Sequence, residues 1–213
     1  MLPNGEPVNY VPGTKIQSDE AELFDDILRL QKPACRSLLE ELKERMTDTE
    51  AMHEALALAR EAADEGEVPV GCIVTDGEHI VGRGRNRREI GKSALAHAEL
   101  EAIAEACRTL GGWRLWRCTL YVTLEPCPMC AGAIINARIP RVVFGAPDPK
   151  AGSCGSVTDL FALPYNHRPA CEGGVLEEEC AQLLRDFFRA LRLAPPKPRW
   201  KPAVLPAQGG DHA

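Results

Sequence analysis

The chain has 213 residues, enough for one well-filled domain with appendages but short for two full domains. Hydrophobic residues make up 45% and charged residues 26%, a composition that excludes a fibrous, collagen-like or wholly disordered chain. The formal charge is −6, from 25 Lys and Arg against 31 Asp and Glu. A globally cationic surface for nucleic acid is therefore excluded, but a local basic patch is not.

The first residues show no basic segment followed by an apolar stretch, so no secretory signal is expected. No run of about 18 apolar residues occurs either, so we expect a cytoplasmic protein with no membrane contact. In that reducing compartment the nine cysteines are interpreted first as core, metal-binding or catalytic residues, and not as a disulfide framework.

Three segments are expected along the chain. Residues 1–45 form an N-terminal extension, a leader containing Pro and Gly followed by two short amphipathic helices. Residues 46–193 form the folded domain. Met46 directly precedes its first helix, which raises the hypothesis that translation starts there and not at Met1. Residues 194–213 are rich in proline and are expected to be a disordered tail.

The expected elements of the folded domain alternate between helices and strands. A helix that Thr47 can cap ends before Gly66, and a β-hairpin turns at Asp76-Gly77. The remaining elements, in chain order, are a helix over 96–110, a strand over 118–124, a helix over 126–137, a strand over 141–145, a loop, and a helix over 176–193. This order predicts an α/β protein with three layers, α/β/α.

Two short segments carry chemistry: His97-Ala98-Glu99 and Pro126-Cys127-Pro128-Met129-Cys130, each at the start of a predicted helix. Zinc binds imidazole nitrogen and thiolate sulfur, and cysteines three positions apart can present both sulfurs on one side of a helical turn. His97, Cys127 and Cys130 would then be three protein ligands, and catalytic zinc sites leave the fourth position to water.

Glu99 can accept a proton from that water and deliver it to a substrate, so the pattern predicts hydrolytic chemistry at one Zn²⁺ per subunit. The cysteine pair alone would also fit a structural zinc corner or a redox pair. No second CxxC occurs in the chain, and His-x-Glu lies about 30 residues upstream of the pair, which favours the catalytic interpretation.

The combination of H-x-E with P-C-x-x-C is the general signature of zinc deaminases. Further matches extend it to most of residues 46–193: Glu67–Gly71, Gly84–Arg87, Ala96–Glu99, Tyr121–Ala133 and Val142–Ala146. On these segments the sequence resembles the bacterial tRNA-specific adenosine deaminases, zinc enzymes of the cytidine deaminase superfamily that convert the wobble adenosine of a tRNA anticodon to inosine.

This resemblance implies a three-layer α/β/α sandwich of the cytidine deaminase type, with a central mixed sheet of about five strands, in a homodimer. It also implies that Glu99 deprotonates the zinc-bound water, that the resulting hydroxide attacks C6 of adenine, and that Glu99 returns protons to the ring and the leaving ammonia. The partner would be a tRNA anticodon stem-loop.

The resemblance also assigns substrate contacts. Asn86 and the backbone of Ala98 would hold the base, Asp148 would contact the neighbouring nucleotide, and Phe188 would touch the anticodon loop. Pro147 and Pro149 flank Asp148, and we expect them to stiffen this loop. The sequence assigns no role to three further cysteines, Cys154, Cys171 and Cys180.

Two basic segments support contact with RNA. Residues 83–92 hold five basic side chains against one acidic one, and residues 185–201 hold six against one. Charge runs also occur on ordinary solvated surfaces. Two alternatives stay open: a deaminase of a free base or nucleoside, such as guanine, cytosine or cytidine, and a non-catalytic zinc module that binds RNA. Glu99 argues against the second, because a structural zinc site has no use for a neighbouring carboxylate.

Overall fold

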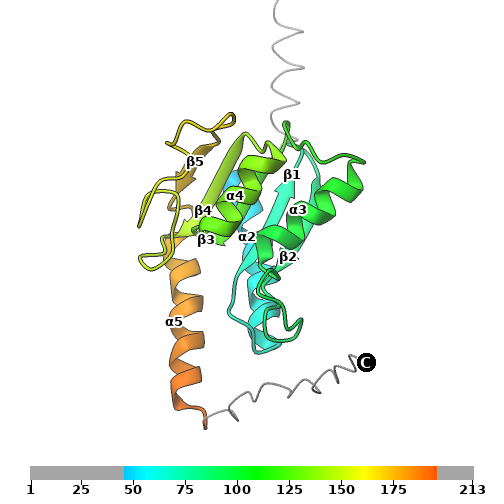
Figure 1. Cartoon of the computed structure of the whole chain (residues 1–213). Helices are drawn as coiled ribbons and strands as arrows, with labels where there is room; N and C mark the ends of the chain where they lie inside the picture. The colour runs from blue at the N-terminus through cyan, green and yellow to red at the C-terminus, as the bar shows by residue number, and fades with distance from the viewer. Residues whose placement is uncertain (1–45, 196–213) are drawn as a thin grey trace, which may run out of the picture. The chain divides into compact units, whose positions relative to one another are not determined.

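The structure, a computed structural model, describes residues 46–195. The predictions for the extension 1–45 and for the tail beyond residue 195 lie outside these residues. The elements, in chain order, are α2 (Asp48–Asp64), β1 (Gly71–Thr75), β2 (Ile80–Arg85), α3 (Ala98–Thr109), β3 (Thr119–Leu124), α4 (Pro128–Ala137), β4 (Arg141–Ala146), β5 (Ala170–Gly173) and α5 (Glu177–Leu193) (Figure 1). Within the described part of the chain, no helix combines the length and the apolar character needed to cross a bilayer.

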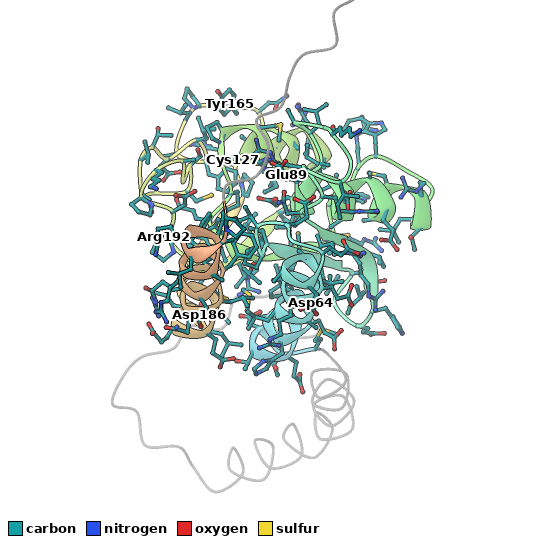
Figure 2. All side chains as sticks on the ribbon, turned by 90° about the horizontal axis from the view of Figure 1, so that it is seen from below. Asp64, Glu89, Cys127, Tyr165, Asp186 and Arg192 are labelled. Carbon is teal, nitrogen blue, oxygen red and sulfur yellow. The ribbon has the colours of Figure 1, made fainter. Side chains whose placement is uncertain are left out.

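The strands form one mixed sheet of five strands in the order β2-β1-β3-β4-β5. Strand β1 is antiparallel to both β2 and β3, whereas β3, β4 and β5 run parallel. Helices α3 and α4 cover one face, and α2 and α5 lie on the other (Figures 1 and 2). Every residue of β1 is buried, as expected for a strand covered on both faces. The predicted α/β/α sandwich with a mixed five-stranded sheet is confirmed.

Strand β5 falls in the segment that the predicted element order treats as a loop. All four of its residues are exposed, so it lacks the apolar or alternating pattern that identifies a strand from sequence. It forms at the sheet edge because its backbone pairs in parallel with β4, from Arg141 opposite Ala170 to Phe144 opposite Gly173. The pairing depends on tertiary structure and not on local propensity.

Helix α3 lies unusually close to β2, because two glycines face it. A Cβ atom at Gly82 would lie 2.2 Å from the Ala102 carbonyl oxygen, and one at Gly84 would lie 2.1 Å from the Ala98 carbonyl oxygen. The facing residues of α3 are small and fully buried: Ala98, Ala102 and Ala106. The packing of these glycines against the alanines fixes the start of α3 relative to the end of β2. It thereby places the functional residues that lie at the start of α3.

The start of α2 is tied to the sheet by one carboxylate. The Arg141 guanidinium donates two hydrogen bonds to Asp48, both 2.7 Å long, and the Tyr121 hydroxyl donates a third at 2.8 Å. Arg141 also donates to Glu172 on β5 at 2.8 Å. The hydrogen bonds from Arg141 lower the pKa of Asp48, against the opposing effect of burial. This network joins α2 to three neighbouring strands.

All eight cysteines among the described residues are free thiols. Cys180 is buried where α5 meets the sheet, and a Cβ atom at Gly145 would lie 2.3 Å from its sulfur. Cys154 lies in the loop that follows β4 and Cys171 lies on β5, and the interaction between them raises the pKa of the Cys154 thiol and lowers that of Cys171. Cys72 and Cys118 lie in the core, as small apolar side chains do.

Replacing Asp48 by asparagine tests the Arg141 network. Because the folded pKa of Asp48 lies below its ordinary value of 3.8, the charged carboxylate stabilises the fold above pH 3.8, and this contribution is lost as pH falls through the folded pKa. We expect Asp48→Asn to lower the free energy of unfolding at neutral pH by about 1–2 kcal/mol, a modest value because both partners are one-third exposed. Urea denaturation measures it.

The control is Glu178→Gln, which removes the carboxylate of an ion pair with Arg185 whose acidic partner is 83% exposed. We expect it to cost less than about 0.5 kcal/mol. The difference in the free energy of unfolding between wild type and Asp48→Asn should become smaller as the pH falls. A difference that stays constant from neutral pH to about pH 3 would contradict this assignment.

Candidate active site

Two of the proposed metal ligands lie directly before helices. His97 is the N-cap of α3 and Cys127 is the N-cap of α4, both with extended backbone and neither with a side chain that caps its own helix. Each helix therefore begins two residues later than the sequence predicts. In this position the side chains extend beyond the helix ends, where the unsatisfied N–H groups and the positive end of each dipole favour negative charge.

The two helix starts bring together a histidine and two cysteines. His97 Nδ1 lies 3.7 Å from Cys127 Sγ and 3.5 Å from Cys130 Sγ, and the three ligand atoms all lie within 4.8 Å of one another. Around a tetrahedral Zn²⁺, nitrogen and sulfur ligands lie about 3.6 Å apart. The spacing and the donor set both fit zinc, with three protein ligands as in catalytic sites. Within residues 46–195 no other group of acids, histidines or cysteines has this geometry.

The electrostatics of the cluster favour a thiolate. A hydrogen bond from the Cys130 thiol lowers the pKa of Cys127 to about 4; a second one from His97 adds to this, and burial opposes it. The same hydrogen bond, together with burial, raises the pKa of Cys130. The interaction with Cys127 also raises the pKa of His97. The cluster stabilises negative charge on sulfur, which is the form that binds a metal.

Glu99 lies in the first turn of α3, beside the cluster. It is only 4% exposed, and burial raises the pKa of its carboxyl group. Its side chain also interacts with the Cys130 thiol. A carboxyl group with a raised pKa at the wall of a pocket is suited to accept and return a proton.

A pocket of about 210 Å³ opens at this point, and it contains most of the residues expected from the sequence. Those that line it are Asn86, Ala98, Asp148, His97, Glu99 and Cys127. Cys130, the third member of the cluster, is fully buried and is not among the residues that line the pocket. Phe188 does not line the pocket: it lies on α5, 40% exposed, with its ring edge-to-face against Phe187 at a centroid distance of 5.5 Å.

Sequence reasoning missed a residue that positions Asn86. The buried Glu67 carboxylate accepts hydrogen bonds from Asn86 Nδ2 at 3.2 Å and from the Ile90 N–H at 2.7 Å, and the Asn86 N–H donates to the Val70 carbonyl at 2.9 Å. Asn86 is thus held at both its side chain and its backbone. Glu67 begins a segment that carries the family resemblance, but its role cannot be inferred locally, because its partners Asn86 and Ile90 lie 19 and 23 residues downstream.

A second buried carboxylate, Glu125, was also missed. It is 2% exposed, and it accepts N–H hydrogen bonds from Asp148 at 3.0 Å, Cys154 at 2.8 Å and Ser156 at 3.1 Å, besides one from the Ser156 hydroxyl. Burial acts to raise the pKa of Glu125, but these hydrogen bonds lower it overall. Glu125 therefore holds the loop that follows β4 as a charged group.

The basic segments are less available for RNA than their sequence suggests. Arg85 is paired with Glu65 at 2.7 Å and with Glu61 at 3.4 Å. On α5, Arg185 is paired with Glu178 and Arg189 with Asp186. Arg88 lines the pocket. Several of the basic side chains counted along the sequence are therefore paired with acids, and Arg88 is the basic residue that lines the pocket.

Comparisons with known proteins agree with this site. The sequence profile of the MafB19-like deaminase family matches residues 46–192. The chain is 49% identical over 142 residues to the tRNA-specific adenosine deaminase of Bacillus subtilis (strain 168), covering 66% of this chain and 88% of that protein. A solved structure from a study of A-to-I editing by tRNA:A34 deaminases at the wobble position of transfer RNA matches with a TM-score of 0.62 and 42% identity, covering 64% of this chain and 99% of that one.

The chain belongs to the MafB19-like deaminase family. Its relatives include tRNA-specific adenosine deaminases, which confirms the resemblance inferred from the sequence. The chain is also 54% identical over 144 residues to a tRNA(Ile)-lysidine synthase of Deinococcus radiodurans, but it spans only 25% of that protein. That match shows the same domain as part of a much longer chain.

Metal analysis tests the ligand set. We expect the purified protein to hold one zinc per chain and Cys127→Ser to lose it, because two protein ligands hold zinc far less tightly than three. Cys107→Ser is the matched control, since its thiol is half-buried on α3 outside the cluster, and it should keep the metal. Elemental mass spectrometry measures the ratio of zinc to protein chain. Full zinc in Cys127→Ser, or equal loss in both variants, would refute the assignment.

Proposed function

We propose that this protein hydrolyses the 6-amino group of adenosine at the wobble position of a tRNA anticodon, giving inosine and ammonia. The observation that carries the proposal is a buried carboxyl group, Glu99, in a pocket wall beside the cluster of His97, Cys127 and Cys130. The 49% identity to the Bacillus subtilis tRNA-specific adenosine deaminase favours adenosine in tRNA over other substrates of this chemistry.

The cluster residues would hold Zn²⁺, which when bound supplies a Lewis acid that lowers the pKa of a water to about 7. Glu99 has the position and the raised pKa needed to take a proton at its carboxylate and deliver it to the ring and to the departing ammonia. Asn86, fixed by Glu67, would donate or accept hydrogen bonds at the base edge. Ala98, the first residue of α3, lines the pocket, and the unpaired N–H groups at this helix start would add further donors.

Two exposed features at the pocket end of the sheet are suited to a polynucleotide. Arg88 lies at the pocket and can contact a phosphate. The last turns of α5, which carry Phe188, project beyond the body of the domain at the end where the loop from β2 to α3 lies (Figure 1). An exposed aromatic ring can stack on an unpaired base of an anticodon loop. We expect the protein in the cytoplasm with this tRNA substrate.

A homodimer is the expected assembly, and α4 supplies the surface that favours it. The helix contains no charged residue, although part of its outer face is accessible at Met129, Gly132, Ala133 and Asn136. A Cβ atom at Gly132 would meet nothing within 4 Å. A helix without charges whose accessible face is apolar except for one amide is normally covered, so we propose that a second copy covers this face. Because Cys127 and Cys130 lie at the start of α4, the interface would adjoin the site.

Glu99→Gln tests the catalytic proposal. The amide keeps the shape of the side chain but cannot carry the proton, so we expect zinc to remain bound and inosine formation to fall by about 10²- to 10⁴-fold. Mass spectrometry of an anticodon stem-loop with a wobble adenosine gives the readout. Glu101→Gln, two residues further along α3, should retain activity.

The same assay separates the alternatives. Free guanine, cytosine and cytidine are offered beside the stem-loop. Deamination of a free base or nucleoside without activity on the stem-loop would overturn the tRNA proposal, and full activity of Glu99→Gln would overturn the mechanism.

Gly132→Arg tests the dimer. The position is open to solvent, so the side chain fits the folded monomer, but a guanidinium in an apolar interface should separate the subunits. Light scattering after size exclusion should give twice the chain mass for wild type and a single chain mass for Gly132→Arg. Ala57→Arg, at an exposed position of α2 on the opposite face of the sheet, should stay dimeric. A monomeric wild type would contradict the proposal.

A further inference from the structure

We propose that Glu125 is a positioning residue for the nucleotide beside the target base and that it acts through Asp148. Both side chains belong to the pocket, yet only Asp148 would contact the substrate. The inference rests on the proposed function, because it assigns a part of the recognition of tRNA to a residue that does not touch the tRNA.

Glu125 is fully occupied by one loop. Its Oε1 accepts the N–H groups of Cys154 and Ser156, and its Oε2 accepts the N–H of Asp148 and the hydroxyl of Ser156. Within residues 46–195 no lysine or arginine forms an ion pair with it. A buried carboxylate costs a large desolvation energy unless donors compensate it, and here all the donors come from residues 148–156.

The loop is also packed tightly around this carboxylate. A Cβ atom at Gly152 would lie 2.3 Å from Glu125 Oε2, so only glycine allows the backbone to pass so close. The Ser153 N–H donates to the Pro126 carbonyl at 2.9 Å, next to the carboxylate along the chain. The loop therefore follows the segment between β3 and α4, which also carries the ligand Cys127.

Asp148 is held by hydrogen bonds at both its backbone and its side chain. Glu125 holds its backbone N–H at 3.0 Å, and its own carboxylate accepts the Lys150 N–H at 2.9 Å, which orients the side chain within the turn. Pro147 and Pro149 restrict the backbone on either side. The placement of the Asp148 carboxylate at the pocket thus depends on the hydrogen bond to Glu125, 23 residues earlier in the chain.

A double-mutant cycle tests this chain of contacts. Glu125→Gln leaves an amide N–H₂ facing donors, so the loop should shift and the KM for the stem-loop should rise by about tenfold, while kcat changes by less than about threefold. Asp148→Asn should raise KM similarly. Because both substitutions act on one contact, the KM of the double variant should exceed that of the more impaired single variant by no more than about twofold. Additive losses would overturn the proposal.

Stem-loops with changed nucleotides beside the wobble adenosine provide the specificity readout. Glu125→Gln and Asp148→Asn should reduce the discrimination among them to the same extent. Glu105→Gln is the matched control: that carboxylate accepts one backbone N–H, from Arg83 at 2.9 Å, and is not among the residues that line the pocket, so its removal should leave discrimination unchanged. Loss of discrimination in Asp148→Asn alone would contradict the role of Glu125.

Hydrogen exchange gives a readout that needs no substrate. The Cys154 and Ser156 amides should exchange at least about tenfold faster in Glu125→Gln, with zinc content unchanged. Unchanged exchange, or loss of zinc, would show that Glu125 does not act by holding this loop. Failure of wild type to form inosine on any stem-loop, with the exchange result intact, would reject the proposed function and the nucleotide assignment but leave the loop contact established.

Discussion

The site depends on the convergence of two helix starts. Helix α3 begins after His97 and helix α4 begins after Cys127, and both N-termini point at the same small volume. Glycines in β2 bring α3 close enough for this, and the end of β3 leads directly into the segment before α4. Because each helix start presents N–H groups and a positive dipole end, the fold itself favours thiolates and a polarised water there.

Three buried carboxylates, Glu67, Glu99 and Glu125, line the pocket or contact a residue that lines it, and their hydrogen bonds distinguish their roles. The carboxylate oxygens of Glu67 and Glu125 accept hydrogen bonds from N–H and O–H groups of the chain, so each carboxylate fixes a neighbouring segment. Glu99 instead faces the pocket, and burial raises its pKa. A carboxylate saturated by hydrogen bonds is poorly suited to move a proton, whereas a desolvated one beside a metal cluster is well suited to it.

Much of the fold and the centre of the site could be predicted because their signals are local. Apolar periodicity and caps identified the helices, and His97, Glu99, Cys127 and Cys130 stand in short motifs. The parts that could not be predicted depend on distant contacts. Strand β5 exists only through its pairing with β4, and Glu125 acts on residues 23 to 31 positions away. The charge of Arg85 is paired with Glu65, 20 positions earlier.

X-ray absorption at the zinc edge of the purified protein tests the central claim most directly. The account predicts two sulfur ligands at about 2.3 Å and two nitrogen or oxygen ligands at about 2.0 Å, one from His97 and one from solvent. With that ligand set, one coordination position is occupied by solvent and is available for the reaction. A fourth protein ligand, or a set of four sulfurs, would show a closed structural site and contradict the account.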